Sequence, residues 1–314
     1  MYDEIRTATE SFWDFLSDIA LLPVLAAICC HLLKLACTSR AWRNVLAAAY
    51  PDRDVPWRGI LGAYVSGVGV NAIIPVRGGD VVRIFLAHRA IPGSSYTTVV
   101  SSTAVLTFVD IAFALSVFVF ALTQGVLPSL DALSRLRAFD YSWAVEDGVI
   151  RPGALIALVV VVGGGGLLLH HFWERLRARV AQAFAVLDPP TRYLRTVVVW
   201  QLADWGLRFA TIWFFLGAFG IHQSIRNVLL AQAATSLAGL VPATPGGIGT
   251  EQALLVYAFR GADVARSTLL AFSVGMKLTL TVVNVIVGFT AIFLILGTVR
   301  YRRFVGQAPD APPP

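Results

Sequence analysis

Long apolar runs, separated by short charged or turn-forming segments, dominate the pattern of hydrophobic and polar positions along this chain. Several runs approach the roughly 20 residues that an α-helix needs to cross the hydrocarbon core of a bilayer. None shows the alternation over about ten residues that marks the strands of outer-membrane barrels. The pattern therefore predicts membrane-spanning helices in five stretches: residues 19–38, 98–123, 153–171, 196–219 and 277–298.

Two further apolar stretches, residues 59–92 and 225–260, are interrupted near their middle. Proline and paired glycine break a helix where a simple span would continue. The interrupting residues are Pro75 with Gly78 and Gly79 in the first stretch, and Pro245 with Gly246 and Gly247 in the second. We therefore expect each stretch to fold as a broken helical hairpin.

Composition supports a chain that is solvated mainly by lipid. Hydrophobic residues make up 57% of the 314 positions and charged residues only 14%, against roughly 25% charged residues in an average soluble protein. We predict an all-α, polytopic membrane helical bundle. Residues 1–303 are expected to form a single transmembrane domain, followed by a disordered, proline-rich tail at residues 304–314.

The net charge of +6 is explained by the position of the basic residues rather than by a nucleic-acid partner. The segments 39–58 and 172–195 hold four and five arginines, and three more lie between residues 300 and 303. Arginine and lysine collect in cytoplasmic loops. The chain is therefore expected in the cytoplasmic (inner) membrane, with its N-terminus outside and its C-terminus in the cytoplasm. That orientation requires both broken stretches to be re-entrant hairpins of opposite polarity.

The two broken stretches also resemble each other in sequence. The run Ile74 to Arg83 and the run Val241 to Glu251 each contain a proline, then a Gly-Gly pair, then an ionisable residue four positions beyond the second glycine. Oppositely oriented copies of an interrupted apolar segment indicate a binding site near the bilayer midplane in transporters that contain inverted repeats. We therefore predict an inverted-repeat arrangement.

At the first break, Gly78 and Gly79 permit a tight turn and Asp80 can cap the helix that follows. The positive end of that helix, together with Arg77 and Arg83, could bind a phosphate or a carboxylate. The alternative is that Asp80 and Arg83, three positions apart, simply pair with each other. Asn71, which precedes the break, can satisfy backbone groups that the break leaves free.

At the second break, Pro245, Gly246, Gly247 and Gly249 predict an unwound backbone before a helix that begins near Glu251. Glu251 either caps that helix at its positive end or pairs with Lys277 or with an arginine of the hairpins. Lys277 is either an interfacial side chain or an interior one that faces the site.

Asp110 is the clearest ionisable residue inside a predicted span, and it has no partner close to it in the sequence. A carboxylate in that position costs about 2.5 to 3.5 kcal/mol on insertion scales, so another group is expected to offset it. Asp204 and Arg208 lie four positions apart in another span, where an internal salt bridge is the simpler interpretation.

Sequence motifs for catalysis are absent. The glycines at 163–166 have no following Lys-Ser or Lys-Thr, so they do not form a phosphate-binding loop. His31, His88 and His222 show no ligand spacing for a metal, and the cysteines at 29, 30 and 37 are interpreted as packing residues. We therefore expect no catalytic residues, no metal and no cofactor, and the protein is predicted not to be an enzyme.

These same residues resemble the flippase-like family named for the transmembrane region of lysylphosphatidylglycerol synthases. The resemblance extends from about residue 12 to residue 298, and it is carried by Ser39 to Arg43, Asn71, Pro75 to Arg83, Asp110 and Pro245 to Glu251. It implies a lipid-translocating membrane module, which in some members is fused to a soluble aminoacyl-transferring domain. No such domain is expected after Arg303.

The resulting hypothesis is a flippase for an anionic or zwitterionic lipid, such as an aminoacyl-phospholipid or a polyprenyl-phosphate-linked sugar. The candidate binding residues are Asn71, Arg77, Gly78, Gly79, Asp80, Arg83, Asp110, Pro245, Gly246, Gly247, Gly249, Glu251 and Lys277. One alternative is a non-transporting subunit that positions a lipid synthase or a glycosyltransferase. The other is a membrane-embedded lipid transferase that uses Asp110 or Glu251 as a base. The oligomeric state is left open.

Overall fold

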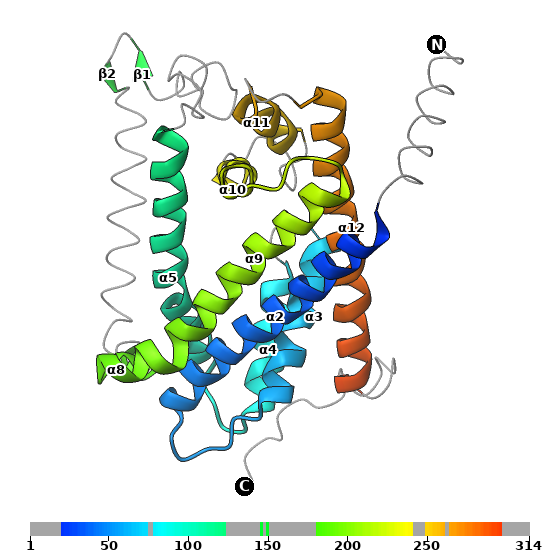
Figure 1. The fold of residues 1–314 in the computed structure, drawn as a ribbon. Helices are drawn as coiled ribbons and strands as arrows, with labels where there is room; N and C mark the ends of the chain where they lie inside the picture. Colours follow the sequence, from blue (N-terminus) through cyan, green and yellow to red (C-terminus); the bar gives the residue numbers. More distant parts are fainter. Residues whose placement is uncertain are drawn as a thin grey trace, which may run out of the picture.

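The computed structural model describes residues 20–74, 78–123, 145–146, 149–150, 180–240, 249–260 and 264–296, and the described part is a helical bundle (Figure 1). The described chain also contains a small antiparallel ribbon of β1 (Val145–Glu146) and β2 (Val149–Ile150), in which Val145 faces Ile150. The predicted span at 153–171 and the tail at 304–314 lie outside the described residues.

Among the described residues, three helices are long and apolar enough to cross a membrane. They are α2 (Leu21–Ala49), α5 (Tyr96–Thr123) and α12 (Arg266–Leu296). At a rise of 1.5 Å per residue, the 29 residues of α2 extend for about 44 Å, so this helix can cross at a steep tilt. In Figure 1, α2 and α9 (Val199–Ala218) run obliquely between the more upright α5 and α12. Helix α9 is the continuation of α8 (Pro190–Tyr193) and of the π-helical turn η3 (Leu194–Val198).

Two helix boundaries differ from the prediction. Helix α2 continues to Ala49 instead of ending at residue 38, and α12 begins at Arg266 instead of residue 277. No proline or glycine interrupts residues 39–49, and the apolar side chains of Trp42, Val45 and Leu46 are fully buried there. The arginines that suggested a loop therefore lie on a helix whose other face is packed.

The first broken stretch forms α3 (Trp57–Ile73) and α4 (Gly78–Ala90), which pack closely against each other. The break falls where it was predicted, and residues 75–77 lie outside the described residues. A Cβ atom on Gly67 would lie 2.7 Å from the carbonyl oxygen of Gly79, so only glycine allows the two backbones to approach this closely.

The loops at the two ends of this hairpin lie together. The Nη1 of Arg53, in the loop before α3, donates to the carbonyl oxygen of Pro92, in the loop after α4, at 2.6 Å. Gly62 contacts Ile295, and Gly69 contacts Asn284 and Gly288 of α12. These contacts show that α3 and α12 run antiparallel. Continued for five residues past Gly69, the same register places Ile74 beside the middle of α12.

The second broken stretch forms α10 (Ile225–Leu240) and α11 (Thr250–Ala258), which also pack together. Residues 241–248 lie outside the described residues. The two helices lie in the upper part of Figure 1, at the end of the bundle opposite the loops of the first hairpin. Gly249 precedes α11 with a φ of +86°, a conformation that favours glycine.

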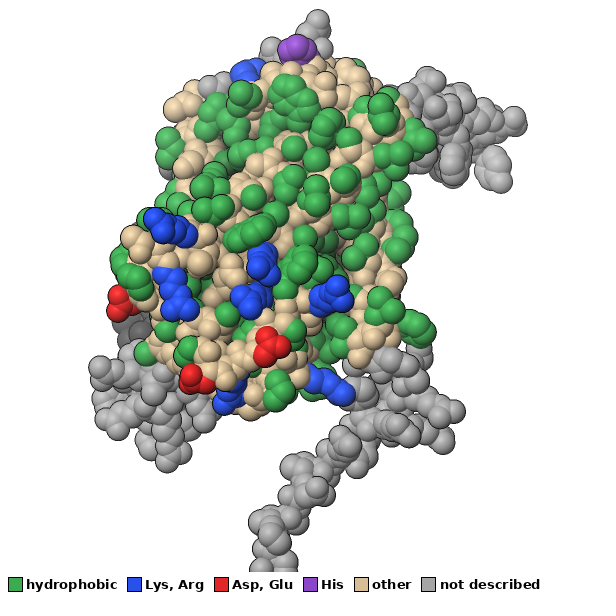
Figure 2. Space-filling model, turned by 60° about the horizontal axis from the view of Figure 1, so that its bottom comes forward, with side chains coloured by type: hydrophobic (Ala, Val, Ile, Leu, Met, Phe, Trp, Pro, Cys, Tyr) green, Lys and Arg blue, Asp and Glu red, His purple; other side chains and the backbone are tan. Residues whose placement is uncertain are grey.

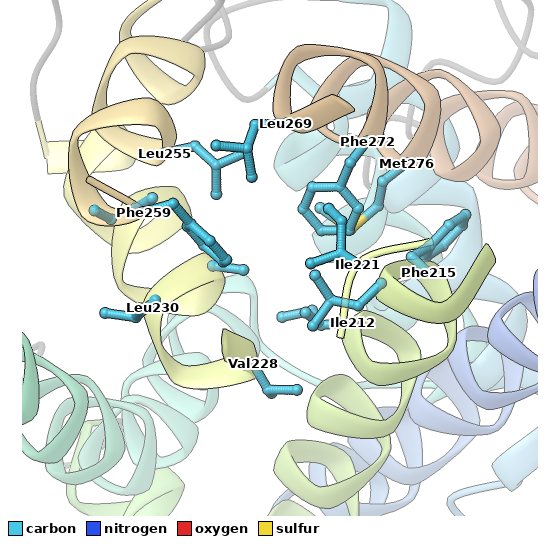
Figure 3. Packing of buried hydrophobic residues seen from close by; sticks show 14 of the residues in the cluster. Ile212, Phe215, Ile221, Val228, Leu230, Leu255, Phe259, Leu269, Phe272 and Met276 are labelled. Atoms are coloured by element: carbon cyan, nitrogen blue, oxygen red, sulfur yellow. The ribbon is translucent and has the colours of Figure 1, made fainter. Parts of the chain in front are cut away.

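The buried apolar residues form two clusters. One is built from the end of α2 with α3, α4 and α5, around Trp42, Leu46 and Ile60. The other is built mainly from α9 to α12, and Figure 3 shows Phe215, Leu255, Phe272 and their neighbours pointing toward one another between these helices. This second cluster borders the site described below.

The surface is largely apolar along the helices. Figure 2, turned so that the lower end of Figure 1 comes forward, shows Lys and Arg side chains gathered around that end. The arginines of that region lie in the second half of α2, in the loops and helix ends of the first hairpin, and in α8 and η3: Arg40, Arg43, Arg53, Arg58, Arg89, Arg192 and Arg195. At the opposite end, the described residues include three exposed arginines: Arg226, Arg260 and Arg266.

Candidate functional site

A cavity of about 170 Å³ lies inside the bundle, between α2, α9, α10 and α12. Its lining residues are His31, Lys34, Arg208, Thr211, Ile212, Gln232, Thr235, Met276 and Leu280. Lys34 lies near the midpoint of α2, Arg208 near that of α9 and Leu280 near that of α12. The cavity is therefore at mid-height of three long helices, and polar and cationic groups line it although its surroundings are apolar.

Hydrogen bonds and an ion pair orient two of its basic groups. The ring Nε2 of His31 lies 2.7 Å from the Oδ1 of Asn284 on α12. The Nη2 of Arg208 lies 3.3 Å from the Oδ2 of Asp204, which is almost completely buried and accepts a second hydrogen bond from the hydroxyl of Thr38. The internal salt bridge predicted for Asp204 and Arg208 is thus confirmed, and it lies on the wall of the cavity.

Lys34 differs from these residues. No salt bridge within 4.0 Å and no hydrogen bond of its ammonium group is found among the described residues, although the side chain is half-buried in the bundle. A cation at this depth is costly unless a partner offsets it. The cavity therefore contains two different cations. The Arg208 guanidinium is paired with Asp204, and the Lys34 ammonium has no ion-pair partner within the described part of the chain.

A second polar group adjoins the cavity at Thr235. Its hydroxyl donates to Glu251 Oε1 at 3.2 Å, and the other carboxylate oxygen of Glu251 lies 3.0 Å from the Nζ of Lys277. Glu251 is 7% exposed, so α10, α11 and α12 meet around a buried carboxylate. Of the alternatives for Glu251, the structure shows the pair with Lys277, whose side chain is 32% exposed. Gly249 occupies the N-cap position of α11 and Glu251 lies in its first turn; the N–H of Gly249 donates to Gln252 Oε1 at 2.7 Å.

The candidate residues of the first break form a separate group. The Oδ1 of Asn71 accepts the N–H of Gly79 at 2.7 Å, and its amide donates to Asp80 at 3.2 Å. Asn71 thus satisfies the beginning of α4, as predicted, whereas Asp80 lies inside the first turn and is not the cap. Because Gly79 already donates to Asn71, its N–H is not free to bind an anion as the sequence had suggested.

Arg83 pairs with Asp80 at 3.5 Å, which is the simpler of the two alternatives considered for it. Its guanidinium also lies over the rings of Trp42, at 5.4 Å, and Tyr64, at 5.7 Å. Gly78 is the first residue of α4. Arg77, Pro245, Gly246 and Gly247 lie outside the described residues.

Asp110 receives a hydrogen bond at 3.0 Å from the indole Nε1 of Trp205. The same indole ring stacks on Phe113 and lies 4.4 Å from the Arg208 guanidinium. Asp110 is therefore connected through one aromatic side chain to the cavity wall, and this indole N–H offsets part of the cost of its position.

The sequence prediction missed Lys34, His31 and Thr38 as members of one site. Lys34 carries the same signal that identified Asp110, because it is an ionisable residue inside a predicted span. Their convergence with Arg208 and Asn284 depends on contacts across α2, α9 and α12, which no local pattern encodes. The described residues contain no cluster of three or more His, Cys, Asp or Glu side chains that could hold a metal ion.

Long apolar helices around a charged interior define a polytopic membrane protein. The model of the family described as the lysylphosphatidylglycerol synthase TM region matches residues 5–288, and the chain belongs to that family. It is also similar to a UPF0104 membrane protein of Methanothermobacter thermautotrophicus, with 23% identity over 274 residues that cover 81% of this chain and 80% of the relative. No solved structure matches the chain.

Proposed function

We propose that this protein is a flippase that moves an anionic or zwitterionic lipid across the cytoplasmic membrane. The cargo is an aminoacyl-phospholipid, a polyprenyl-phosphate-linked sugar or a lipid of similar charge. The observation that carries the proposal is the mid-height cavity in which Lys34 and Arg208 meet. Membership in a family named for a lipid-synthase membrane region is in keeping with a role in lipid handling.

Charge supports an anionic ligand at this position. Three acid–base pairs, Asp80–Arg83, Asp204–Arg208 and Glu251–Lys277, neutralise most of the interior charges. The Asp110 carboxylate accepts a hydrogen bond from an indole N–H, whereas the Lys34 ammonium has no hydrogen bond or ion pair among the described residues. A phosphate that enters the cavity would supply the missing partner of Lys34 and accept hydrogen bonds from Arg208 as well.

The size of the cavity indicates which part of the lipid it holds. About 170 Å³ is smaller than the roughly 300 to 1,000 Å³ of pockets that enclose a drug-sized ligand. The cavity would therefore hold the headgroup, while the acyl or prenyl chains stay in the bilayer. Since no nucleotide-binding motif is present in the sequence, movement would be downhill or coupled to an ion gradient.

The proposal includes the orientation of the two hairpins. Seven of the arginines named above lie at the end of the bundle that holds the loops of the first hairpin, against three at the opposite end of the described chain. By the positive-inside rule, the first hairpin would enter from the cytoplasm and return to it. The second hairpin would be its inverted counterpart from outside, with the N-terminus outside and the C-terminus in the cytoplasm.

The roles proposed for the predicted residues follow from these positions. Glu251 and Lys277, next to the cavity, would adjust the local charge as the second hairpin moves, and Asp110 would do so through Trp205. Asn71, Gly79, Asp80 and Arg83 would shape the tip of the first hairpin. Arg77, Gly246 and Gly247, which lie outside the described residues, are also proposed to contact the headgroup.

The test is lipid transfer by the purified protein in phosphatidylcholine liposomes that carry a trace of tail-labelled phosphatidylglycerol. Bleaching of the outer leaflet reports the rate at which inner-leaflet label appears outside. Lys34→Gln should slow that rate by about tenfold or more, because a hydrogen bond to a charged group is lost. Lys34→Arg should retain most of the activity, and Arg195→Gln, which removes an exposed cation elsewhere, should not change it.

Two results would overturn different parts of the proposal. Equal rates for Lys34→Gln and the parent would show that the cavity is not the binding site. If the parent moved neither labelled phosphatidylglycerol nor a labelled polyprenyl phosphate, the flippase activity itself would be wrong. A non-transporting membrane subunit would then be the better description.

A further inference from the structure

A second depression, of about 400 Å³, lies on the side of the bundle between α2, α3 and α9. Its lining residues are Leu33, Ala36, Cys37, Arg40, Trp57 and Trp200. The four residues from α2 are spaced by three, one and three positions, so they occupy one face of that helix. We call this depression the lateral groove.

The lateral groove has an apolar floor and a single charge. Leu33 is 52% exposed and both tryptophans are 36% exposed, so the groove faces the surroundings of the bundle rather than its core. Tryptophan is enriched where the hydrocarbon core meets the headgroup region. In the proposed orientation, Arg40 and Trp57 lie at the cytoplasmic end of the groove, and Leu33 lies deeper in the bilayer.

The charge is available to a ligand. The guanidinium of Arg40 lies 5.7 Å from the ring centre of Trp57, and it makes no ion pair or hydrogen bond to any other described residue. Arg43, one turn further along α2, provides the contrast: it donates to Val55 at 2.9 Å and to Asn44 at 3.3 Å. Trp57 is itself held by a hydrogen bond of 3.2 Å from its indole N–H to Ser39.

The same two helices connect the lateral groove to the cavity. Lys34 follows Leu33 on α2, and Trp200, Asp204 and Arg208 are spaced by four positions on one face of α9. A lipid seated in the groove would therefore have its headgroup beside the helix pair that carries the cations of the cavity.

We propose that the lateral groove binds one anionic phospholipid of the cytoplasmic leaflet, with its phosphate on Arg40 and an acyl chain along Ala36 and Leu33. Charge complementarity selects this occupant. An arginine at the end of an apolar groove matches a phosphate that is attached to a hydrocarbon chain, and because Arg40 has no ion pair among the described residues, it favours a lipid with a net negative charge over a zwitterionic one. The binding of this lipid in the lateral groove does not depend on the proposed flippase activity. Delivery of the bound lipid to the cavity rests on the proposed function.

The experiment uses phosphatidylglycerol with a photoactivatable group in one acyl chain, incorporated with the full-length protein into phosphatidylcholine liposomes. After illumination, mass spectrometry locates the adducts on the protein. We expect them on the α2 segment from Leu33 to Arg40 and at Trp200. Arg40→Gln should lower this labelling by about tenfold, because the contact with the phosphate is lost, and Arg40→Lys should keep part of it.

Arg192→Gln is the matched control, since it removes an exposed arginine from the same end of the bundle and should leave the labelling unchanged. Equal labelling by a phosphatidylcholine probe, or in Arg40→Gln, would overturn the proposal. Lys34→Gln separates the two hypotheses, because this variant should be labelled in the groove as the parent is, while its rate of lipid transfer falls as stated above. Groove labelling in a protein that transports no lipid would retain the binding site and reject the flippase.

Discussion

The two helical hairpins have similar broken sequences, but different interactions hold them in place. The first, α3–α4, is fixed by direct contact of its backbones. A Cβ atom on Gly79 would overlap the carbonyl oxygen of Gly67, and one on Gly69 would lie 2.7 Å from the backbone of α12 at Asn284 and Gly288. No residue larger than glycine fits at these two positions, so this hairpin is expected to pack as a rigid unit against α12.

The second hairpin, α10–α11, is connected to α12 through side chains. Glu251 pairs with Lys277, and Gln252 Nε2 donates to Ser273 at 3.1 Å. Such contacts can be exchanged for the charges of a ligand, whereas a backbone contact cannot. The second hairpin also contributes Gln232 and Thr235 to the cavity, so in the proposed transport it is the hairpin whose contacts could be exchanged.

The largest effect is expected for Gly79→Ala. The added methyl would displace α3 from α4, and overpacking costs about 1 to 3 kcal/mol of the free energy of unfolding, occasionally more. Because the methyl would overlap a backbone oxygen, we expect a loss at the upper end of that range, about 3 kcal/mol. Unfolding by SDS in mixed micelles measures that loss.

Gly206→Ala is the control for Gly79→Ala, because a Cβ at this glycine of α9 has no atom within 4 Å. It should be neutral or slightly stabilising, since alanine favours a helix more than glycine does. If the two variants unfolded alike, the rigid packing assigned to the first hairpin would be wrong.

The second effect in size is expected for Glu251→Gln. The substitution leaves Lys277 without its carboxylate partner, and loss of one member of a buried pair costs about 3 to 5 kcal/mol. Since 32% of the Lys277 side chain is exposed, solvent reduces the expected loss to about 2 kcal/mol.

The double variant Glu251→Gln with Lys277→Met tests the origin of that loss. It should unfold at a higher SDS fraction than Glu251→Gln alone, because the charge that Glu251 balanced is removed together with the carboxylate. A double variant with the summed losses of the two single variants would show that the pair does not connect the hairpin to α12.

The breaks in both hairpins could be predicted because they are local. Helix α3 ends at Ile73, just before the run in which the sequence predicted a break, and Gly249 is the N-cap of α11. The end of α2 was mispredicted because a local signal, the charges of Arg40 and Arg43, suggested a loop. In the structure Arg40 lies over the Trp57 ring and Arg43 donates to Val55, while the opposite face of the continuing helix is buried. Local rules therefore give breaks more reliably than they give the ends of helices.

The composition of the cavity could not be predicted in the same way. His31 and Asn284 are separated by 253 positions, and Thr38 and Asp204 by 166. The packing of α2 on α9 and α12 brings them together, and this packing depends on the whole bundle. The sequence identified Glu251, Lys277 and Asp110 as costly charges, but it could not give their partners Thr235 and Trp205.

A smaller effect is expected from the side chains that satisfy the beginnings of α4 and α11. Asn71→Ala frees the N–H of Gly79, and Gln252→Ala frees that of Gly249. Each should cost about 1 kcal/mol by SDS unfolding, which is typical for the loss of a helix cap.

Their effect on transport should differ. Gln252→Ala also removes the contact with Ser273 of α12, so it should change the rate of lipid transfer, whereas Asn71→Ala should leave the rate nearly unchanged. Equal changes in rate would contradict the assignment of the second hairpin as the moving element.

The smallest effect is expected for Asp80→Asn. The carboxylate lies 3.5 Å from Arg83 but its side chain is 37% exposed, and a partly exposed pair contributes only about 0 to 1 kcal/mol. Arg83 would keep its contacts with the rings of Trp42 and Tyr64, so its position does not depend on the pair. Arg83→Met should cost more than Asp80→Asn, because it removes both the charge and the ring contacts. If Asp80→Asn destabilised the protein as much as Glu251→Gln does, a charge pair would be as important to the first hairpin as to the second. The conclusion that backbone packing holds the first hairpin and side-chain pairs hold the second would then be wrong.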